Sequence, residues 1–319
     1  MDDAPDGGAE SRALLVPAGW HGQRLDRALA ALVPELSRSY LQQLIEGGQL
    51  ALNGARASKP ALRVKAGDAL CLRILPTPQS QAFVPQAMAL EVVFEDEHLA
   101  VIDKPAALVV HPAPGNWGGT LLNGLLARDE RARQLPRAGI VHRLDKDTSG
   151  LMVVARSRAA MAGLVERLAA RQVRREYVAL AHGAWRGAAQ RTVDAPIGRD
   201  PRNRLRMAVV DLEKNAGKAA QTFVTLLHNS EQGCVLQCRL GTGRTHQIRV
   251  HLAHLGHPLL ADALYGGAPA AGLTRQALHA RRLAFEHPVT LQPLAFDSPL
   301  PPDMAQAMRQ WALGYNLPE

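Results

Sequence analysis

Two short apolar runs enclose a polar stretch near the middle of the chain, and this pattern restricts how the chain can fold. The first run is Ile140-Val141, the second is residues 151–155, and the nine residues between them read His-Arg-Leu-Asp-Lys-Asp-Thr-Ser-Gly. Runs rich in β-branched residues and interrupted by Asp, Thr, Ser and Gly indicate two strands joined by a loop. Asp145 is therefore predicted to lie at a strand end, in a loop held by rigid structure, where chemistry is often located.

Size and charge narrow the class of protein. The 319 residues allow one large domain or two, with a substantial core. Lys and Arg number 37 against 29 Asp and Glu, and the net charge of +8 favours a polyanionic partner such as nucleic acid. No run approaches the roughly 18 apolar residues of a spanning helix, and the start Met1-Asp2-Asp3 lacks the features of a signal peptide. We expect a cytoplasmic protein without a membrane partner.

The cysteines and histidines were considered as metal ligands. Cys71, Cys234 and Cys238 form no disulfide framework, and the last two lie in a strand-like run where both side chains face the same side. Core thiols are the favoured interpretation of that pair, with a metal as the alternative. A dense group of histidines also lacks the spacing of a zinc signature, so we expect no metal; the group is His246, His251, His254 and His257.

The N-terminal part of the chain reads as a tail followed by a small module. Residues 1–19 are expected to be a disordered tail. Apolar residues then recur at helical spacing over 25–32, and Ser37 is a suitable N-cap for a second helix. The pair Asn53-Gly54 follows a strand-like run and is a strong tight-turn signal. Two helices followed by a small sheet are predicted.

The rest of the chain reads as a second domain. Residues 76–88 begin with the proline and polar character of a linker, so we place the domain boundary there. From residue 89 to 319, strand-like runs alternate with a few helices, such as one over 158–171. This pattern predicts a mixed α+β domain.

Two segments resemble known families. The stretch from His142 to Gly150 resembles the signature of the RluA-type pseudouridine synthases, whose motif carries the catalytic aspartate, and this places the nucleophilic carboxylate at Asp145. Residues 20–75 resemble an S4-type RNA-binding domain in Ser37-Arg38-Ser39 through Gly48, in Asn53-Gly54 and in residues 65–68. The resemblance runs from about residue 20 to 305. It implies an α+β protein with a small N-terminal S4-like domain and a catalytic domain built on a mixed, largely antiparallel sheet.

Basic residues cluster in the S4-like segment, as phosphate contacts require. The alternative is a basic face that is merely solvated. The residues expected to bind RNA are Arg24, Arg38, Arg56 and Lys59.

The implied reaction explains why particular residue types are needed. Conversion of uridine to pseudouridine breaks the N-glycosidic bond, turns the uracil and rejoins it through carbon, so no cofactor is expected. It needs a carboxylate that acts on the sugar or the base, and a cation that keeps this carboxylate charged. Arg249 lies in residues 243–251, which resemble the third motif of the family, where an arginine pairs with the aspartate. Arg244 is the competing candidate, more suited to RNA or structure, and Arg249 could also be a surface charge on a strand.

Four further residues are expected at the site. Tyr177, in a segment that resembles the second motif, is expected to stack on the uracil and to take part in proton transfer, although a lone Tyr on a strand is usually core. Arg143 resembles the arginine that fills the gap left by the flipped base. His142 is a weaker candidate that could simply hold the loop. Leu278 resembles the apolar contact beneath the base, but leucine is more often core.

Other functions were weighed against this one. Asp145 and Asp147 could be a carboxylate pair for glycoside hydrolysis, but such pairs face each other across a sugar, usually from different elements, and these two share one loop. An S4-type RNA-binding factor for ribosome assembly, without catalysis, is the second alternative. The joint presence of Asp145, Tyr177 and Arg249 argues against it.

Finer matches suggest a substrate. Residues 137–139, Lys146, Gly115-Asn116 and 275–280 resemble the branch of the family that modifies the large ribosomal subunit. That resemblance implies the helix 69 hairpin of 23S ribosomal RNA as the target, although related branches share most of these motifs. The expected partner is large-subunit ribosomal RNA or a pre-ribosomal particle, and the protein is expected to be a monomer.

Overall fold

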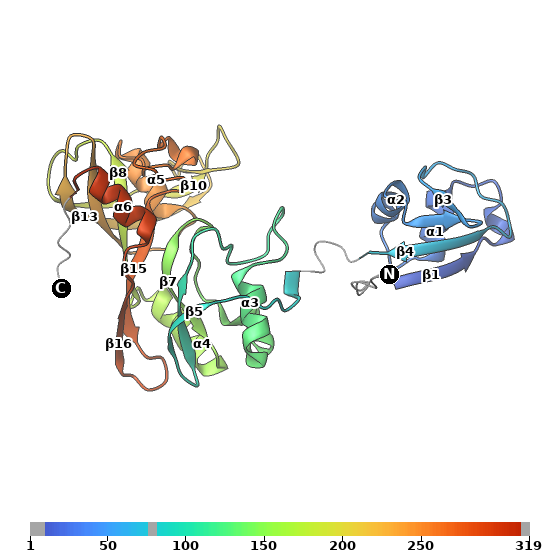
Figure 1. Ribbon diagram of the computed structural model, residues 1–319, viewed down its shortest axis with the longest axis horizontal. Helices are drawn as coiled ribbons and strands as arrows, with labels where there is room; N and C mark the ends of the chain where they lie inside the picture. The colour runs from blue at the N-terminus through green and yellow to red at the C-terminus, as the bar shows by residue number, and fades with distance from the viewer. Residues whose placement is uncertain (1–9, 76–81, 314–319) are drawn as a thin grey trace. The chain divides into compact units, whose positions relative to one another are not determined.

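A computed structural model describes residues 10–75 and 82–313, which fall into two units (Figure 1). Unit 1 comprises Met1–Gln81 and unit 2 comprises Ala82–Glu319, so the division falls within the segment 76–88 interpreted as a linker. Residues 1–9 of the expected tail lie outside the described residues. Each unit has its own hydrophobic core, and each is therefore described by itself.

Unit 1 contains a four-stranded sheet in the order β1-β4-β2-β3. The expectation of a tail up to residue 19 is wrong from residue 10 onward. The first strand pairs antiparallel with the last one, from Glu10 opposite Ile74 to Leu15 opposite Ala69, and this distant partner supplies its hydrogen bonds. The elements are β1 (Glu10–Leu15), η1 (Ala18–Trp20), α1 (Leu25–Leu32), α2 (Arg38–Glu46), β2 (Leu50–Leu52), β3 (Ala55–Ala57) and β4 (Ala69–Ile74).

Local signals in unit 1 act as predicted. The Ser37 hydroxyl accepts a hydrogen bond from the Tyr40 amide at 3.2 Å and caps α2. Asn53 and Gly54 both have positive φ, 51° and 80°, which a two-residue hairpin turn between β2 and β3 requires. The apolar faces of the two helices are buried with the sheet in one cluster that includes Leu25, Leu29, Leu41, Ile45, Leu50 and Leu72.

Unit 2 is built on a nine-stranded sheet in the order β5-β6-β7-β15-β8-β14-β13-β9, with β16 paired to β15. Its strands are β5 (Glu91–Glu95), β6 (Leu99–Lys104), β7 (Ser149–Ala155), β8 (Arg174–His182), β9 (Gln190–Asp194), β13 (Gln221–Asn229), β14 (Gly233–Leu240), β15 (Leu278–Glu286) and β16 (Pro293–Asp297). The pairing of β7 with β15 is parallel and the other pairings of this sheet are antiparallel. The predicted α+β fold with a mixed, largely antiparallel sheet is confirmed.

A second, three-stranded sheet has the order β11-β10-β12 and consists of β10 (Ile197–Arg199), β11 (Met207–Val209) and β12 (Gly217–Lys218). The α-helices of unit 2 are α3 (Leu121–Arg128), α4 (Arg158–Ala169), α5 (Gln247–His254) and α6 (Pro302–Gln310), and its 3-10 helices are η3 (Glu130–Gln134), η4 (Pro136–Gly139) and η5 (Ala263–Tyr265). Among the residues described, no helix is both long and apolar enough to span a membrane.

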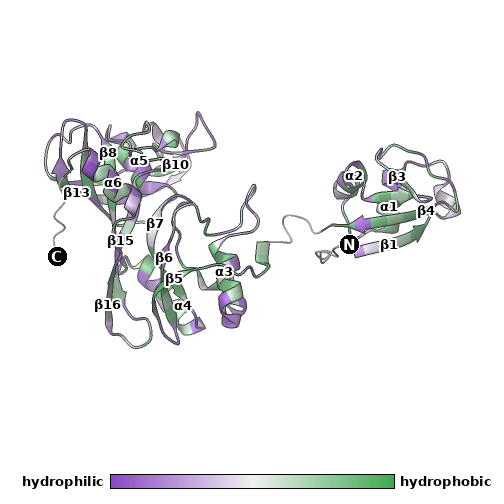
Figure 2. Ribbon diagram, in the orientation of Figure 1, coloured by the Kyte–Doolittle hydropathy of each residue, from purple (hydrophilic) through white to green (hydrophobic). Residues whose placement is uncertain are grey.

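Strand β7 lies at the centre of the core. All seven of its residues are buried, as expected for a strand covered on both faces, and Figure 2 shows the apolar character of the neighbouring strands. Gly150 in this strand has a φ of 112°, and a Cβ atom there would lie 2.3 Å from the carbonyl oxygen of Ala280 on β15. The last residue of the signature must therefore be glycine for the two strands to meet.

Two expectations about the motifs are wrong. Ile140-Val141 is not a strand: Ile140 makes a single bridge to Val154, because η4 precedes it with positive φ at Arg137 and Ala138 and the polar loop follows at once. The idea that Arg249 could be a surface charge on a strand is also wrong. Residues 247–254 form α5, and Arg249 is buried.

Candidate active site

A cleft of about 930 Å³ opens in unit 2 beside the polar signature loop. Its walls come from that loop, from β8 and from the segment that leads into α5. The structure brings together around this cleft all seven residues that sequence analysis assigned to the site of unit 2. They are His142, Arg143, Asp145, Tyr177, Arg244, Arg249 and Leu278.

Asp145 pairs with Arg249 through one carboxylate oxygen. The Arg249 Nη1 atom lies 3.0 Å from Asp145 Oδ2, and the two side chains are 8% and 15% exposed. The other carboxylate oxygen, Oδ1, accepts no hydrogen bond from any residue within the described ranges, and the Nε2 atom of His246 lies 3.9 Å from it. One oxygen is thus held by a buried cation, and the other has no hydrogen-bond donor among the described residues.

Arg249 is itself held by Asp262. Its Nε and Nη2 atoms each donate to a different oxygen of Asp262 at 2.8 Å, a bidentate contact with a carboxylate that is 1% exposed. Burial opposes the charge of Arg249, but hydrogen bonds and the negative charge of Asp262, together with Asp145, outweigh this and raise the pKa of the guanidinium. Arg249 therefore presents a fixed, permanent positive charge to Asp145.

Tyr265 and His246 surround this ion pair. The guanidinium of Arg249 lies 4.9 Å from the centre of the Tyr265 ring, and His246 Nδ1 is 2.8 Å from the Tyr265 hydroxyl. The same hydroxyl accepts a hydrogen bond from the Met207 amide at 3.1 Å. Burial lowers the pKa of His246, so a neutral imidazole stands next to Asp145.

Two cations anchor the backbone of the signature loop from outside the cleft. Lys104, at the end of β6, is fully buried, and its ammonium donates to the carbonyl oxygen of Lys146 at 3.0 Å. Burial lowers the pKa of Lys104 to about 8. Arg275 donates to the carbonyl oxygen of Asp147 at 2.9 Å. The loop that carries Asp145 is therefore fixed through the carbonyl groups of the two residues that follow it.

Asp147 does not line the cleft. Its backbone carbonyl anchors the loop, as the Arg275 contact shows. The signature loop thus places one carboxylate in the cleft, and it does not form the opposed pair that glycoside hydrolysis needs.

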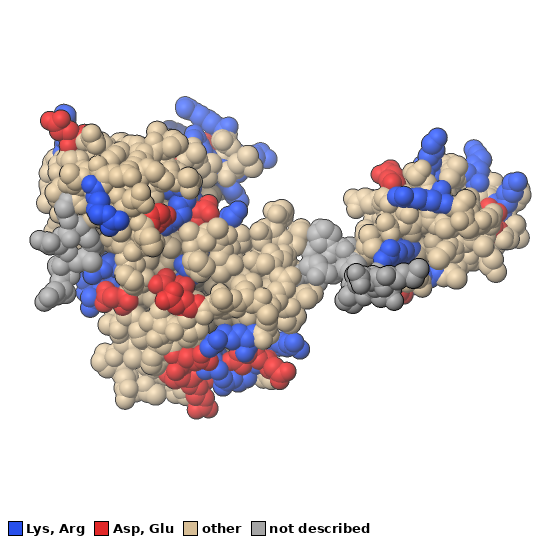
Figure 3. Space-filling model, in the orientation of Figure 1, with Lys and Arg blue, Asp and Glu red and all other residues tan. Residues whose placement is uncertain are grey.

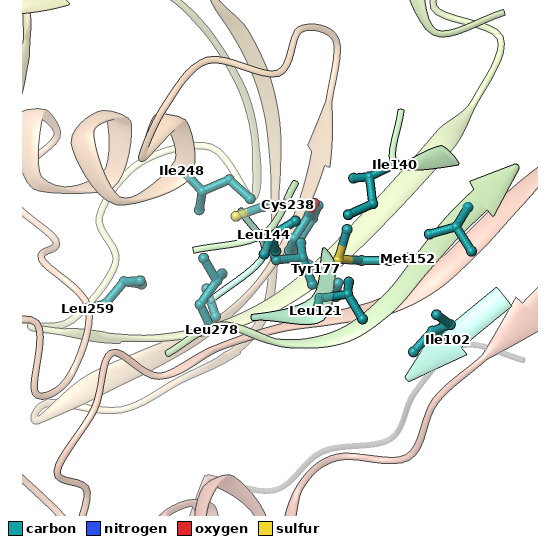
Figure 4. Packing of buried hydrophobic residues seen from close by; sticks show 14 of the residues in the cluster. Ile102, Leu121, Ile140, Leu144, Met152, Tyr177, Cys238, Ile248, Leu259 and Leu278 are labelled. Carbon is teal, nitrogen blue, oxygen red and sulfur yellow. The ribbon is translucent and has the colours of Figure 1, made fainter. Parts of the chain in front are cut away.

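Tyr177 and Leu278 form the apolar floor of the cleft. Both belong to the buried cluster drawn in Figure 4, where Tyr177 lies between Leu144, Leu121 and Met152. Burial raises the pKa of the Tyr177 hydroxyl to about 12, so the phenol is protonated at neutral pH. Each of the two side chains therefore packs in the core and also lines the cleft, and their contact with a base stays a prediction.

His142 and Arg143 begin the signature loop and have different surroundings. His142 Nε2 accepts a hydrogen bond from the Val153 amide at 3.1 Å, which ties the loop to β7, and burial lowers the pKa of this imidazole to about 3. Arg143 is exposed at the cleft, and its side chain has no hydrogen-bond partner in the part of the chain that the structure describes. The hydrogen bond of His142 to β7 fits the interpretation in which this residue holds the loop.

Arg244 lines the cleft but does not pair with Asp145. Its Nε atom donates to the carbonyl oxygen of Ala219 at 3.0 Å, and its amide donates to Gln247. Of the two arginines weighed as partner of Asp145, Arg249 makes the ion pair.

Several of the cysteines and histidines that could be metal ligands take part in packing or hydrogen bonding instead. Cys234 and Cys238 are buried in the core, and burial raises the pKa of the Cys234 thiol to about 12. Both ring nitrogens of His251 are hydrogen-bonded, to Thr222 and to the carbonyl of Ala195. Within residues 10–75 and 82–313, no group of three or more His, Cys, Asp or Glu side chains is arranged to hold a metal ion.

Two of the four residues of unit 1 that are predicted to bind RNA form ion pairs within the unit. Arg24 and Arg38 both donate to the buried carboxylate of Asp26. Arg56 donates to the carbonyl oxygen of Gly47 at 2.9 Å, and Lys59 is exposed.

Sequence reasoning missed three residues of the site, Asp262, Tyr265 and Lys104. A lysine that closes the apolar run of β6 was a usable signal, because a charge at a strand end inside a core must have partners. Asp262 and Tyr265 lie in a short irregular segment around η5 with no periodicity, and nothing in that segment indicates their contacts.

Comparison with known proteins agrees with this geometry. The family model described as RNA pseudouridylate synthase matches residues 98–254, and the S4 domain model matches residues 23–70. A relative from Xylella fastidiosa, named ribosomal large subunit pseudouridine synthase D, is 47% identical over 311 residues, which cover 93% of this chain and 92% of the relative. A relative of the same name from Pseudomonas aeruginosa is 47% identical over 305 residues, covering 92% of this chain and 93% of the relative.

Solved structures show the same fold. Human RNA pseudouridylate synthase domain containing 1 aligns with a TM-score of 0.53 and 25% identity over 66% of this chain and 83% of its own. Human RNA pseudouridylate synthase domain containing 4 aligns with a TM-score of 0.55 and 23% identity over 72% of this chain and 95% of its own. Given the extent of the identity to its relatives, the chain belongs to the RluA-type family of RNA pseudouridine synthases and carries an S4 domain at its N-terminal end.

Proposed function

We propose that this enzyme isomerises uridines of 23S ribosomal RNA to pseudouridine, that Asp145 is its nucleophile and that the helix 69 hairpin is its preferred substrate. One observation carries the assignment of Asp145: its Oδ2 atom is paired with Arg249 at 3.0 Å while Oδ1 accepts no hydrogen bond from a described residue. A carboxylate that is paired with a buried cation through one oxygen and has no hydrogen-bond partner on the other is equipped to attack carbon.

The balance of the reaction requires only residues of this chain. The bond from C1′ to N1 breaks and a bond from C1′ to C5 forms, while C5 loses a proton and N1 gains one, so the product is an isomer of the substrate. Asp145 Oδ1 forms a transient bond to the sugar or the base and is released when the new carbon–carbon bond is made. Arg249 stabilises the carboxylate before attack and after release, because its charge is fixed by Asp262.

Tyr177 and Leu278 hold the uracil. The ring of Tyr177 offers a stacking surface and Leu278 an apolar contact. Because burial raises the pKa of Tyr177 to about 12, its hydroxyl serves as a hydrogen-bond donor rather than as a base at neutral pH. The apolar contacts with the Tyr177 ring and with Leu278 are non-directional, so they can hold the detached base while it turns.

Arg143 is proposed to enter the space that the flipped nucleotide leaves. It is exposed at the cleft, two residues before the nucleophile. Its planar guanidinium can stack between bases and pair with phosphate. A loop uridine is cheaper to extrude than one in a continuous stack, which favours a hairpin loop as the substrate.

Relatives that are 46–47% identical to this chain support large-subunit ribosomal RNA as the substrate, because they are named ribosomal large subunit pseudouridine synthases. The S4 domain adds a second RNA-binding unit, which suits a structured RNA that is held outside the cleft as well as inside it. The resemblance of residues 137–139 and 275–280 to the large-subunit branch supports the helix 69 hairpin in particular.

A comparison of substrates tests the proposal. Tritium release from carbon 5 would be measured with the helix 69 hairpin, with other hairpins of 23S ribosomal RNA and with transfer-RNA anticodon arms. We expect the highest kcat/KM for the helix 69 hairpin. A higher value for another RNA would move the enzyme to a different branch of the family, and equal loss of turnover on all of them in Asp145→Asn would still support the assigned nucleophile.

A further inference from the structure

The small sheet of unit 2 carries a protruding basic loop. β10 and β11 pair from Ile197 opposite Val209 to Arg199 opposite Met207, and residues 200–206 connect them. This connection, named here the 200–206 loop, reads Asp-Pro-Arg-Asn-Arg-Leu-Arg and so has three arginines and one carboxylate. Basic side chains gather at the edge of unit 2 over the segment labelled β10 (Figures 1 and 3).

The loop is held in one conformation by its own hydrogen bonds. The Asp200 carboxylate accepts from the Arg202 amide at 2.8 Å and from Arg206 Nε at 2.6 Å. The Asn203 side chain accepts from the Leu205 amide at 3.0 Å. Because these bonds already fix the backbone, a partner that binds the loop has little ordering entropy to overcome.

The tip of the loop presents groups that the fold does not use. The side chains of Arg202 and Arg204 are exposed and have no hydrogen-bond or ion-pair partner among the described residues. Leu205, directly after Arg204, is 83% exposed. A lone exposed leucine needs no explanation, but one that lies on a fixed loop beside two free guanidinium groups matches the chemistry of a nucleic-acid wedge, in which cations bind phosphates and an apolar side chain contacts a base.

The base of the small sheet is attached to the active site. Ile197 and Ala220 pack against Val250 of α5, the helix that carries Arg249. The amide of Met207, the residue after the loop, donates to the Tyr265 hydroxyl. The residues of the loop do not line the cleft, but these contacts attach the loop to the block that holds the ion pair.

From these contacts we propose that the 200–206 loop binds the RNA strand that flanks the target uridine. Arg202 and Arg204 pair with phosphates and Leu205 packs against an unstacked base. This inference rests on the proposed function in one respect only, that an RNA occupies the cleft. It assigns to the small sheet an RNA contact that is separate from Asp145 and from the S4 domain.

Two variants of the full chain test the phosphate contacts and the base contact separately. For Arg202→Gln/Arg204→Gln, the Kd for a transcript of the 23S domain that contains helix 69 should rise about tenfold, and the slope of log K against log salt should fall by roughly 1.4, about 0.7 for each single-strand phosphate. For Leu205→Ser, the Kd should rise roughly fivefold without a change of slope, because no charge is lost. Turnover at saturating RNA should change less than about twofold in both.

Matched controls are available on the same unit. Arg186→Gln/Arg191→Gln removes two exposed arginines that do not line the cleft, and Leu291→Ser replaces another leucine that is 61% exposed. The proposal is overturned if these controls weaken binding as much as the loop variants do. It is also overturned if the loop variants lose turnover with unchanged Kd, which would make the loop a support for Tyr265. Absence of wild-type turnover on this transcript would instead overturn the proposed substrate, and the Kd comparison would still decide the role of the loop.

Discussion

Each unit pairs an aspartate with arginine, but the more deeply buried partner is the aspartate in unit 1 and the arginine in unit 2. In unit 1, Asp26 is 0% exposed, whereas the side chains of Arg24 and Arg38 are 45% and 49% exposed. In unit 2 the arginine is the deeper partner: Arg249 is 8% exposed and Asp145 is 15% exposed.

The hydrogen bonds explain what this difference means. Asp26 Oδ1 accepts from Arg24 at 3.0 Å, and its Oδ2 accepts from Arg38 at 2.7 Å and from Gln42 at 2.6 Å. Burial alone would raise the pKa of Asp26, and these hydrogen bonds outweigh it and bring the pKa well below its usual range. Both oxygens of Asp26 are in use, as in a carboxylate that stabilises a fold, whereas Oδ1 of Asp145 has no hydrogen-bond partner among the described residues, as the proposed nucleophile requires.

The largest effect is expected from Asp145→Asn. The amide keeps the shape of the side chain but cannot attack carbon, so kcat should fall by about 10⁴-fold or more. Thermal unfolding and the Kd for RNA should stay close to wild type. Asp147→Asn is the control, since the loop is anchored through the Asp147 carbonyl, and it should keep most of its activity. Turnover of Asp145→Asn within tenfold of wild type in a tritium-release assay would contradict the assignment.

A smaller loss is expected from Asp262→Asn. This change removes the carboxylate that fixes Arg249, so Arg249 is free to shift away from Asp145, and kcat should fall about 10²-fold while KM changes little. Asp26→Asn is the matched change in unit 1. It should leave kcat within about twofold and lower the free energy of unfolding of that unit by about 1–3 kcal/mol, because the buried side chain at position 26 loses charge-assisted hydrogen bonds. If the two variants had equal effects on kcat, the distinction between the two clusters would fail.

Removal of residues 1–81 tests whether the basic face of unit 1 contacts RNA. Residues 82–319 have their own core and should remain folded by circular dichroism and cooperative in denaturant. The affinity for 23S ribosomal RNA should fall about tenfold, and the slope of log K against log salt should decrease by about 1 or more as phosphate contacts are lost. An unchanged slope would mean that Arg56, Lys59 and their neighbours are only solvated.

The last prediction separates the two units by the pH dependence of their stability. Burial lowers the pKa of His142 to about 3 and of His279 to about 4, below the usual value near 6.5, so both imidazoles are neutral in folded unit 2. Between pH 4 and pH 6.5 the two histidines bind more protons in the unfolded chain than in folded unit 2. The free energy of unfolding of unit 2 should therefore fall as pH decreases from about 6.5 to 4, by up to about 1.4 kcal/mol per pH unit for each histidine.

The stability of unit 1 should depend less on pH between about 6.5 and 4. The pKa of Asp26 is lowered, so its contribution is present above the unfolded value near 3.9 and is lost only as pH falls below it. Urea unfolding of the separate units at pH 7 and pH 5 measures the difference. In unit 2, His142→Gln should reduce the pH dependence, and an equal acid response of both units would contradict this account.

Local sequence determined much of the fold and the centre of the site. Helical spacing and the cap at Ser37 fixed α1 and α2, and Asn53-Gly54 fixed a turn, because these signals act over a few residues. The motif resemblances identified Asp145, Tyr177 and Arg249 as residues of one site, and the structure places all three around one cleft.

Tertiary structure alone decided the contacts that support these residues. Glu10–Leu15 carries no strong strand signal and becomes ordered because β4 lies beside it. The Ile140 segment fails to form a strand because the turn before it leaves room for a single bridge. Asp262 reaches Arg249 from a segment without periodicity, and Lys104 reaches the signature loop across 42 positions of sequence. Such contacts depend on packing between distant segments, and no local pattern records which segments will meet.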